Sequence, residues 1–270
     1  MSGKIRPEDF AKKEIVFRLP GMESVAARRD MEFRAADGGV LAMDLYSPRG
    51  AEPGTRLPVV VLVAGYPDPG FEKFLGRRFK EMGSSVSWAR LLAASGLAAI
   101  AYTNREPAAD LEALLRHIRE NASSLGVDGK RIGMLAFSGN APVALSALMQ
   151  EGRDLRCAAL CYGYLLDLDG STAVAEAAAT FRFANPCAGK SAEDLPRDVS
   201  IFLARAGRDD TPRLNETMDR FVAAVLKLNL LLTLVNHPDG PHAFDLFDES
   251  ERSLEIVRQV LAFLRFNLLG

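Results

Sequence analysis

Residues 131–148, RIGMLAFSGNAPVALSAL, join two kinds of secondary structure with almost no connection between them. The apolar residues 132–137 predict a buried strand, and residues 142–149 predict a helix that begins at a proline, with Ser138 at the junction. A turn this tight needs small neighbours, and Gly139 provides one. A strand that passes directly into a helix is typical of layered α/β folds, and it leaves the Ser138 hydroxyl exposed at the end of the strand.

The rest of the chain repeats this alternation of strand and helix. Residues 57–64 (LPVVVLVA) form an uninterrupted apolar run rich in β-branched residues, as expected for a strand covered on both faces. Asp37-Gly38-Gly39 predicts a hairpin within residues 29–46. Further strands are predicted at 97–102, 156–162, 199–204 and 230–235. Helices are predicted at 85–95, 107–125 and 171–181, and two more follow: one after Thr211-Pro212 and a closing helix that ends near residue 269. The predicted fold class is α/β: a mostly parallel twisted sheet of about eight strands, with helices on both faces and an antiparallel N-terminal hairpin.

The domain organisation predicted from this pattern is simple. Residues 1–28 carry few regular signals and are expected to form an N-terminal arm, whereas residues 29–270 are expected to form a single domain. Two stretches interrupt the rhythm: residues 66–84, rich in Pro and Gly, are expected to be a long loop, and residues 166–196 a short cap-like insertion. Both leave the carboxyl ends of predicted parallel strands, so they should form the rim of a ligand site.

Charge and cysteine content narrow the classes of partner. The 33 basic and 35 acidic residues nearly cancel, which argues against a nucleic-acid or anionic-membrane surface and favours a small-molecule partner. No apolar run reaches 18 residues, and charges are scattered through the N-terminus, so we expect a cytoplasmic protein. Cys157, Cys161 and Cys187 lack metal-binding spacing and are expected to be reduced thiols. The sequence contains no motif for a metal or an organic cofactor.

A serine at its ordinary pKa is a poor nucleophile, so Ser138 needs a base to take its proton and a third group to orient that base. Three histidines are present. His117 lies on the flank of the amphipathic helix predicted at 107–125 and is expected at the surface. His237 directly follows the last strand and is expected to be an ordinary loop residue, whereas His242 lies in a turn that can direct its side chain back over the sheet. His242 is therefore favoured as the base.

The orienting carboxylate is expected after the strand before last, where two aspartates are adjacent. Asp209 still belongs to the loop that leaves this strand. Asp210 is nearer the helix start at Thr211-Pro212 and could interact with that N-terminus instead. Asp209 is the favoured acid, with Asp210 as the alternative.

Residues 136–140, AFSGN, resemble the nucleophile elbow of the α/β-hydrolases, whose usual pattern is Gly-x-Ser-x-Gly. Ala136 and Asn140 stand at the two glycine positions of that pattern. In this family the base lies in a Gly-x-His-x-Phe context, which residues 240–244 match. The chain order Ser138, Asp209, His242 is also that of the family, and the resemblance covers roughly residues 30–268. It implies an α/β-hydrolase domain with a catalytic triad.

The negative charge that develops on the substrate needs donors already pointed at it, commonly two backbone N–H groups. Gly139, directly after the predicted nucleophile, should supply one. The other should come from the loop after strand 57–64, where the family often has His-Gly and this chain has Ala64-Gly65-Tyr66. Tyr66 N–H is therefore the second expected donor of an oxyanion hole.

Within the superfamily the chain looks most like the dienelactone hydrolase-like branch, although many members of that branch use cysteine where this chain has serine. The resemblance implies a carboxylesterase, and the apolar residues Phe71, Trp88, Tyr162 and Phe181 are expected to line a pocket for short acyl or aromatic esters. Two other functions stay open. One is a peptidase, thioesterase or acyltransferase with the same triad, and the other is a non-catalytic binding protein on the same fold.

Overall fold

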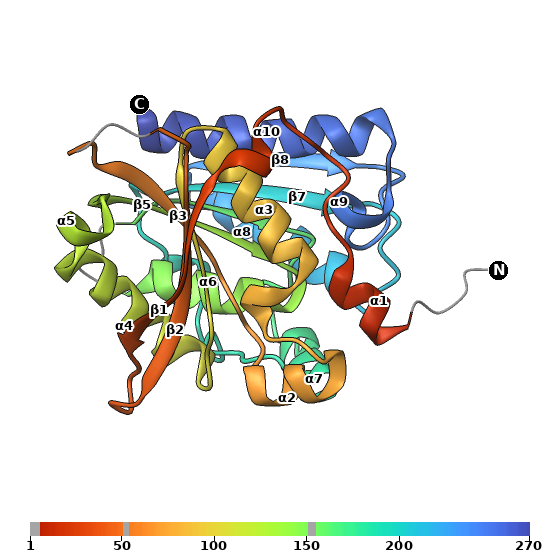
Figure 1. Ribbon diagram of the computed structural model, residues 1–270. Helices are drawn as coiled ribbons and strands as arrows, with labels where there is room; N and C mark the ends of the chain where they lie inside the picture. Colours follow the sequence, from red (N-terminus) through yellow and green to blue (C-terminus); the bar gives the residue numbers. More distant parts are fainter. Residues whose placement is uncertain (1–5, 51–53, 151–154) are drawn as a thin grey trace.

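The computed structural model describes residues 6–50, 54–150 and 155–270. Its centre is an eight-stranded sheet in the order β1-β2-β4-β3-β5-β6-β7-β8 (Figure 1). The pairs β1·β2 and β2·β4 are antiparallel, and every other pair is parallel. The strands are β1 Ala26–Arg34, β2 Val40–Ser47, β3 Leu57–Leu62, β4 Ala98–Tyr102, β5 Val127–Phe137, β6 Leu155–Cys161, β7 Ser200–Ala206 and β8 Leu232–His237. The predicted α/β sheet with its N-terminal hairpin is confirmed.

Helices cover both faces of this sheet, as predicted. The α-helices are α1 Pro7–Lys12, α2 Asp68–Leu75, α3 Gly83–Ala94, α4 Pro107–Glu120, α5 Ala122–Leu125, α6 Ala141–Met149, α7 Ala173–Phe181, α8 Leu214–Lys227, α9 Phe244–Phe247 and α10 Glu251–Leu269. One core contains apolar residues of α4, α6 and α8, and a second core on the other face contains those of α3 and α10. The central strands are therefore buried on both sides, which explains their continuous apolar sequences. None of these helices is both long and apolar enough to cross a membrane.

The segment 66–84 differs from the predicted loop, because it contains α2 and a 3₁₀ turn at Phe79–Glu81. Its prolines and glycines mark the ends of α2 instead of preventing a helix. Pro69 occupies the first turn, where its missing N–H costs nothing, and Gly76 ends the helix at φ 71° in the left-handed region. The predicted start at Thr211-Pro212 also needs correction, because α8 begins at Leu214 after Arg213 and has no capping side chain.

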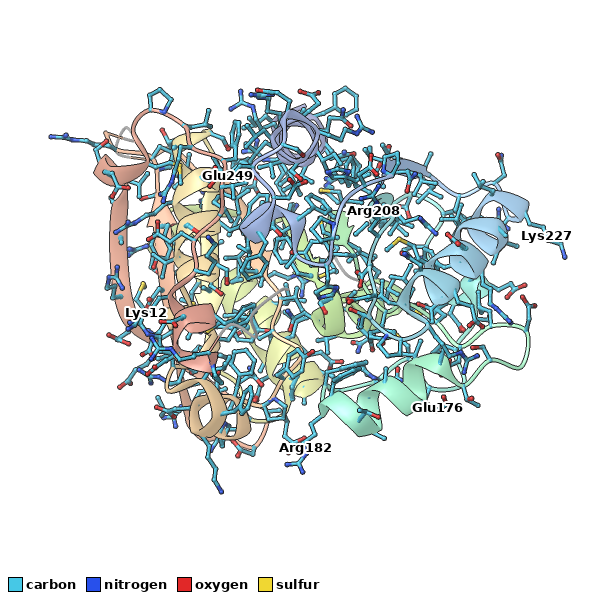
Figure 2. The ribbon with its side chains drawn as sticks, turned by 90° about the vertical axis from the view of Figure 1, so that its right-hand side faces the viewer. Lys12, Glu176, Arg182, Arg208, Lys227 and Glu249 are labelled. Atoms are coloured by element: carbon cyan, nitrogen blue, oxygen red, sulfur yellow. The ribbon has the colours of Figure 1, made fainter. Side chains whose placement is uncertain are left out.

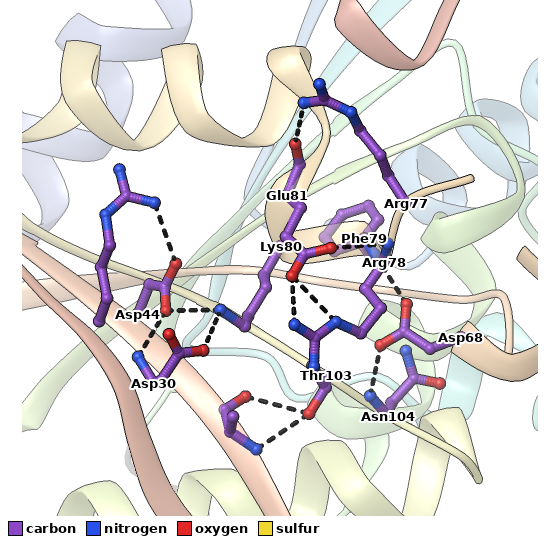
Figure 3. Close-up of polar contacts among 12 residues, drawn as sticks. Asp30, Asp44, Asp68, Arg77, Arg78, Phe79, Lys80, Glu81, Thr103 and Asn104 are labelled. Carbon is purple, nitrogen blue, oxygen red and sulfur yellow. Dashed lines mark hydrogen bonds and ion pairs between the residues drawn. The ribbon is translucent and has the colours of Figure 1, made fainter. Parts of the chain in front are cut away.

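Buried charges tie this segment to the N-terminal hairpin. Lys80, in the 3₁₀ turn, is 2% exposed, and its Nζ lies 2.8 Å from carboxylate oxygens of both Asp30 and Asp44 (Figure 3). Asp44 is fully buried, whereas Asp30 is largely exposed. A lysine is buried this deeply only when its charge is paired, so the contact with Asp44 fixes the position of the turn.

The carboxylate of Asp68 provides a second attachment at the start of α2. It accepts hydrogen bonds from the backbone N–H groups of Phe79, at 2.7 Å, and Asn104, at 2.9 Å (Figure 3). Asp68 thus links α2 to the 3₁₀ turn and to the loop after β4. The segment that follows β3 is thus attached to the rest of the domain through both Lys80 and Asp68.

The N-terminal arm packs onto the domain instead of lying apart from it. The Ile15 N–H donates to Ser87 Oγ on α3, at 3.1 Å, and the Val16 N–H donates to the carbonyl oxygen of Asp245, at 2.8 Å. Figure 2 shows Lys12, at the end of α1, on the same face of the molecule as Arg208, which follows β7. The arm therefore reaches the edge of the sheet at which parallel strands end.

Candidate active site

Ser138 lies at the junction of β5 and α6, within a single 3₁₀ turn, Ser138–Asn140. Its backbone has φ 54°, in the left-handed region, although it is not a glycine. Non-glycine residues adopt this conformation rarely and at an energetic cost, and such strain is concentrated at functional sites. The strained turn directs attention to the Ser138 side chain, which lines a cavity at the carboxyl edge of the sheet.

The close packing around this turn explains why Asn140 stands where a glycine was expected. Asn140 Oδ1 accepts a hydrogen bond from the Gly65 N–H at 2.7 Å, which ties the turn to the loop after β3. Gly65 itself must lack a side chain, because a Cβ there would lie 2.5 Å from the Gly139 carbonyl oxygen. The glycine that this close packing requires is thus Gly65, on the loop after β3, and not residue 140. The spacing of residues around Ser138 does not indicate this.

His242 and Asp209 are brought together from separate loops. His242 Nδ1 lies 2.7 Å from Asp209 Oδ2 and 3.2 Å from Thr211 Oγ1. The Asp209 side chain is fully buried, whereas Asp210 is exposed. Because a carboxylate only accepts hydrogen bonds, the contact implies that Nδ1 carries the proton and that Nε2 is free to accept one. Of the two neighbouring aspartates, Asp209 is the one that contacts His242.

The charge of Asp209 is set by two opposing effects. Burial alone would raise its pKa, but hydrogen bonds from His242 and Thr211 more than compensate and hold the pKa of the carboxyl below its ordinary value. Asp209 therefore remains an anion next to the imidazole.

The backbone of the two loops explains this meeting. The Gly207 N–H donates to the His237 carbonyl oxygen at 2.8 Å, and the Arg208 N–H donates to the Gly240 carbonyl oxygen at 2.9 Å. A Cβ on Gly207 would overlap the carbonyl of Pro238, so this close approach requires glycine. The loop after β7 thus continues the pairing of β7 with β8 and positions Asp209 beside the His242 turn.

Ser138 and His242 line the same cavity, which has a volume of about 170 Å³ and walls that are mainly apolar. Of the residues predicted for the pocket, Phe71, Trp88 and Tyr162 line this cavity. Phe181 does not, and it lies in a neighbouring groove together with Phe71 and Tyr66. The cavity also has walls that the sequence did not suggest, including Phe10, Leu62, Phe79, Met82, Phe137 and Leu246.

The Tyr66 and Gly139 N–H groups are the two donors expected for an oxyanion hole. Within the described chain, neither the Tyr66 N–H nor the Gly139 N–H donates a hydrogen bond to another residue. The Tyr66 side chain also reaches this turn, because its hydroxyl lies close to Gly139. Burial raises the pKa of Tyr66 to about 12, so its hydroxyl stays protonated. The sequence had indicated only the backbone of Tyr66.

The wall of the cavity also contains a buried carboxylate, Asp245. The sequence had not suggested this residue. It accepts hydrogen bonds from Trp88 Nε1, at 2.7 Å, and from the Tyr162 hydroxyl. The Tyr162 ring lies edge-on to the His242 imidazole, with 5.0 Å between the centroids. Burial raises the pKa of Asp245 above its ordinary value. Asp245 lies on α9, directly after the turn that contains His242, but its partners come from distant segments.

The other two histidines do not line this cavity. His237 is not the ordinary loop residue that was expected: it is the last residue of β8 and is buried, with Nε2 3.0 Å from both Asp248 Oδ2 and Ser253 Oγ. His117 lies on α4, half-buried, with Nδ1 3.3 Å from the Asn121 amide.

The cysteines lie away from the cavity lining, and all three are buried and unpaired. Burial raises the pKa of each thiol, so they are not reactive thiolates. In the part of the chain that the structure describes, no three His, Cys, Asp or Glu side chains gather in a way that could hold a metal ion.

Comparison with known proteins gives similarity in structure and not in sequence. No protein-family model matches the chain, and no curated protein matches it. A bacterial heroin esterase superposes with a TM-score of 0.71 at 14% identity, over 94% of this chain and 87% of the other. The esterase LipW from Mycobacterium marinum superposes with a TM-score of 0.68 at 18% identity, over 92% of this chain and 83% of the other. The propionate-bound esterase Est2 from Thermogutta terrifontis superposes with a TM-score of 0.64 at 19% identity, over 92% of this chain and 97% of the other. These similarities show that the chain has the α/β-hydrolase fold.

Proposed function

We propose that this protein is a serine hydrolase that cleaves carboxylic esters, with Ser138 as nucleophile, His242 as base and Asp209 as the acid that orients it. The observation that carries the proposal is the 2.7 Å contact between His242 Nδ1 and the buried Asp209, in a site where His242 shares a cavity with a serine in a strained turn. Nucleophile, base and orienting acid are the groups that acyl transfer requires.

The reaction then proceeds in two halves. Ser138 Oγ attacks the ester carbonyl carbon while His242 Nε2 accepts the hydroxyl proton, and Asp209 stabilises the resulting imidazolium. The carbonyl oxygen becomes negatively charged and accepts hydrogen bonds from the Tyr66 and Gly139 N–H groups. The C–O bond to the alcohol breaks, and the alcohol leaves with the proton from His242. Water, deprotonated by His242, then attacks the acyl-enzyme and releases the acid and the free serine.

The activities of the structural neighbours support ester substrates over the alternatives. All three proteins named above are described as esterases, one of them with propionate bound. Because this chain has Ser138 where many members of the dienelactone hydrolase-like branch have cysteine, we favour simple esters over dienelactone chemistry. We also propose a cytoplasmic location, on the basis of the sequence pattern alone.

The test is labelling with a fluorophosphonate probe, followed by peptide mapping, together with hydrolysis of 4-nitrophenyl butyrate. We expect the label on Ser138 and a fall in kcat of several orders of magnitude in Ser138→Ala, as when triad members are removed from other serine hydrolases. Ser123→Ala, at an exposed serine of α5, is the matched control and should retain wild-type turnover. Absence of label, together with unchanged turnover in Ser138→Ala, would show that Ser138 is not the nucleophile.

A further inference from the structure

A second apolar concavity adjoins the cavity that contains Ser138. It is a groove of about 710 Å³, bounded by α1, α2 and the end of α7. Phe10, Tyr66 and Phe71 line both spaces, so the groove begins where the cavity ends. In Figure 2, the labels Lys12 and Arg182 mark the elements on its two sides, the end of α1 and the residue that follows α7.

The two spaces differ in exposure. Leu62 and Trp88, in the wall of the cavity, are each only 2% exposed. Phe74 and Phe181, in the wall of the groove, are 70% and 43% exposed. Both spaces reach solvent, but the cavity beside Ser138 has the more deeply buried walls and the groove has the more exposed ones.

The two spaces also differ in what they can hold. A dry protein cavity of about 150 Å³ accommodates one benzene ring, so the 170 Å³ cavity has room for a single ring or a short chain. Pockets for ligands the size of a drug molecule measure about 300–1,000 Å³, a range that includes the groove. A fused-ring or branched apolar group fits the groove and not the cavity.

The order of the reaction decides which part of an ester belongs in each space. The alcohol departs while the acyl group is still bonded to Ser138, and the acyl group leaves only after water has attacked. A group that must leave first is better placed in the wider and more exposed space. The group that stays attached is better placed in the narrower space beside the serine.

We propose that the narrow cavity beside Ser138 binds the acyl group and that the groove between α1, α2 and α7 binds the alcohol, so that the substrates are esters of short acids with bulky apolar alcohols. This assignment rests on the proposed ester hydrolysis and adds the substrate class to it. Phe10 and Phe71 separate the two subsites. The exposed rings of Phe74 and Phe181 become covered when the alcohol binds.

A pair of reversed esters with the same atoms tests the assignment. 2-(1-Naphthyl)ethyl acetate carries its bulk on the alcohol, and ethyl 1-naphthylacetate carries it on the acid. Their overall hydrophobicity is therefore closely similar, and both release a primary alcohol. We expect kcat/KM for the acetate to be higher by at least about tenfold, because a naphthyl group overfills the 170 Å³ cavity.

A groove-filling variant makes the test specific. Gly70 lines the groove on α2, and a Cβ there would meet no atom within 4 Å. Gly70→Trp should therefore fill the groove without disturbing the backbone, and the preference for the acetate should fall about tenfold. Ala223→Trp places the same side chain on the exposed face of α8 and should keep the wild-type preference. If Gly70→Trp does not fold, Phe181→Asp weakens the same subsite by adding a charge to its rim.

The outcomes separate this inference from the proposed function. Fluorophosphonate labelling of Ser138, with hydrolysis of both esters at equal rates or a preference for the naphthylacetate, would overturn the subsite assignment alone. An unchanged preference in Gly70→Trp and Phe181→Asp would also overturn it. If the wild-type protein neither reacts with the probe nor hydrolyses 4-nitrophenyl acetate, the proposed function fails and the subsite assignment fails with it.

Discussion

At the scale of single residues, Asp209 and Asp210 show that the environment of a side chain can change completely between adjacent positions. The Asp209 side chain is fully buried against His242, and Asp210 points into solvent. Neighbouring residues with the same chemistry thus have opposite environments. The sequence favoured Asp209 from its distance to the helix start, and the hydrogen bond to His242 now supports its proposed role.

Exchange of each aspartate for asparagine tests this distinction. We expect Asp209→Asn to lower kcat by about 10⁴-fold, the loss that the same change causes in a Ser-His-Asp protease, because the ring loses its anionic partner and its required tautomer. Asp210→Asn is the matched control and should stay within about twofold of wild type, since surface changes rarely matter more. Steady-state kinetics on 4-nitrophenyl butyrate measure both. A larger loss in Asp210→Asn would mean that the neighbouring aspartate is the acid.

The distance between partners along the chain decides which parts of the site the sequence could indicate. Ser138, Asp209 and His242 each follow a separate predicted strand, and parallel strands end at one edge of the sheet. The contacts of Asn140 and Asp245 are different, because they join residues 75 and 157 positions apart through loop packing. No local pattern marks such pairs. The sequence could therefore suggest candidates for the reacting groups, but it could not identify the residues that hold them in place.

At the scale of secondary structure, burial explains which elements were predictable. Strands covered on both faces have continuous apolar sequences, and for this reason β3, β4, β6 and β7 were predicted within a few residues of their ends. The structure of segment 66–84 was not predicted, because its prolines and glycines indicate chain reversals and do not indicate the helix between them. What orders that segment is the buried Lys80, whose partners on β1 and β2 are 50 and 36 residues away.

Removal of the Lys80 charge should destabilise the fold. Lys80→Met removes the nearer cation from the buried Asp44 and leaves only Arg29, with Nη1 at 3.8 Å. Because breaking a buried ion pair from one side costs about 3–5 kcal/mol, we expect a loss near the lower end of that range. We expect the urea midpoint to fall accordingly. Lys73→Met, on the exposed surface of α2, is the control and should change the stability by less than about 0.5 kcal/mol. The double variant Lys80→Met/Asp44→Asn should recover part of the loss, and equal stability of Lys80→Met and wild type would contradict this account.

At the scale of the whole molecule, Asp245 joins segments from both ends of the chain. Its carbonyl oxygen accepts from the Val16 N–H of the N-terminal arm, and its carboxylate accepts from Trp88 on α3 and from Tyr162 after β6. His242 lies on the turn directly before it. The arm, a helix covering the sheet, a strand end and the proposed base thus share one buried group. A carboxylate in this position costs free energy whenever it is ionised without full compensation.

This cost should appear as a pH dependence of the unfolding free energy. Because burial raises the pKa of Asp245 in the folded state, the folded protein holds this proton more tightly than the unfolded chain does. The stability linked to the proton is fully present below the unfolded pKa of about 3.9, and it is lost as the pH rises through the higher folded value. Asp245→Asn cannot ionise. Its amide can still accept from Trp88 and donate to the Tyr162 hydroxyl, so the hydrogen bonds are retained.

We therefore expect the stability of Asp245→Asn relative to wild type to increase as the pH rises from 4 to 7. Urea unfolding at each pH measures the difference. Asp239→Asn, at a largely exposed aspartate paired with an exposed Arg208, should show a much smaller change over the same range, since solvent-exposed ion pairs contribute little. A relative stability of Asp245→Asn that stays constant or decreases with pH would mean that the folded state does not penalise the carboxylate. The hydrogen bonds from Trp88 and Tyr162 would then outweigh its burial.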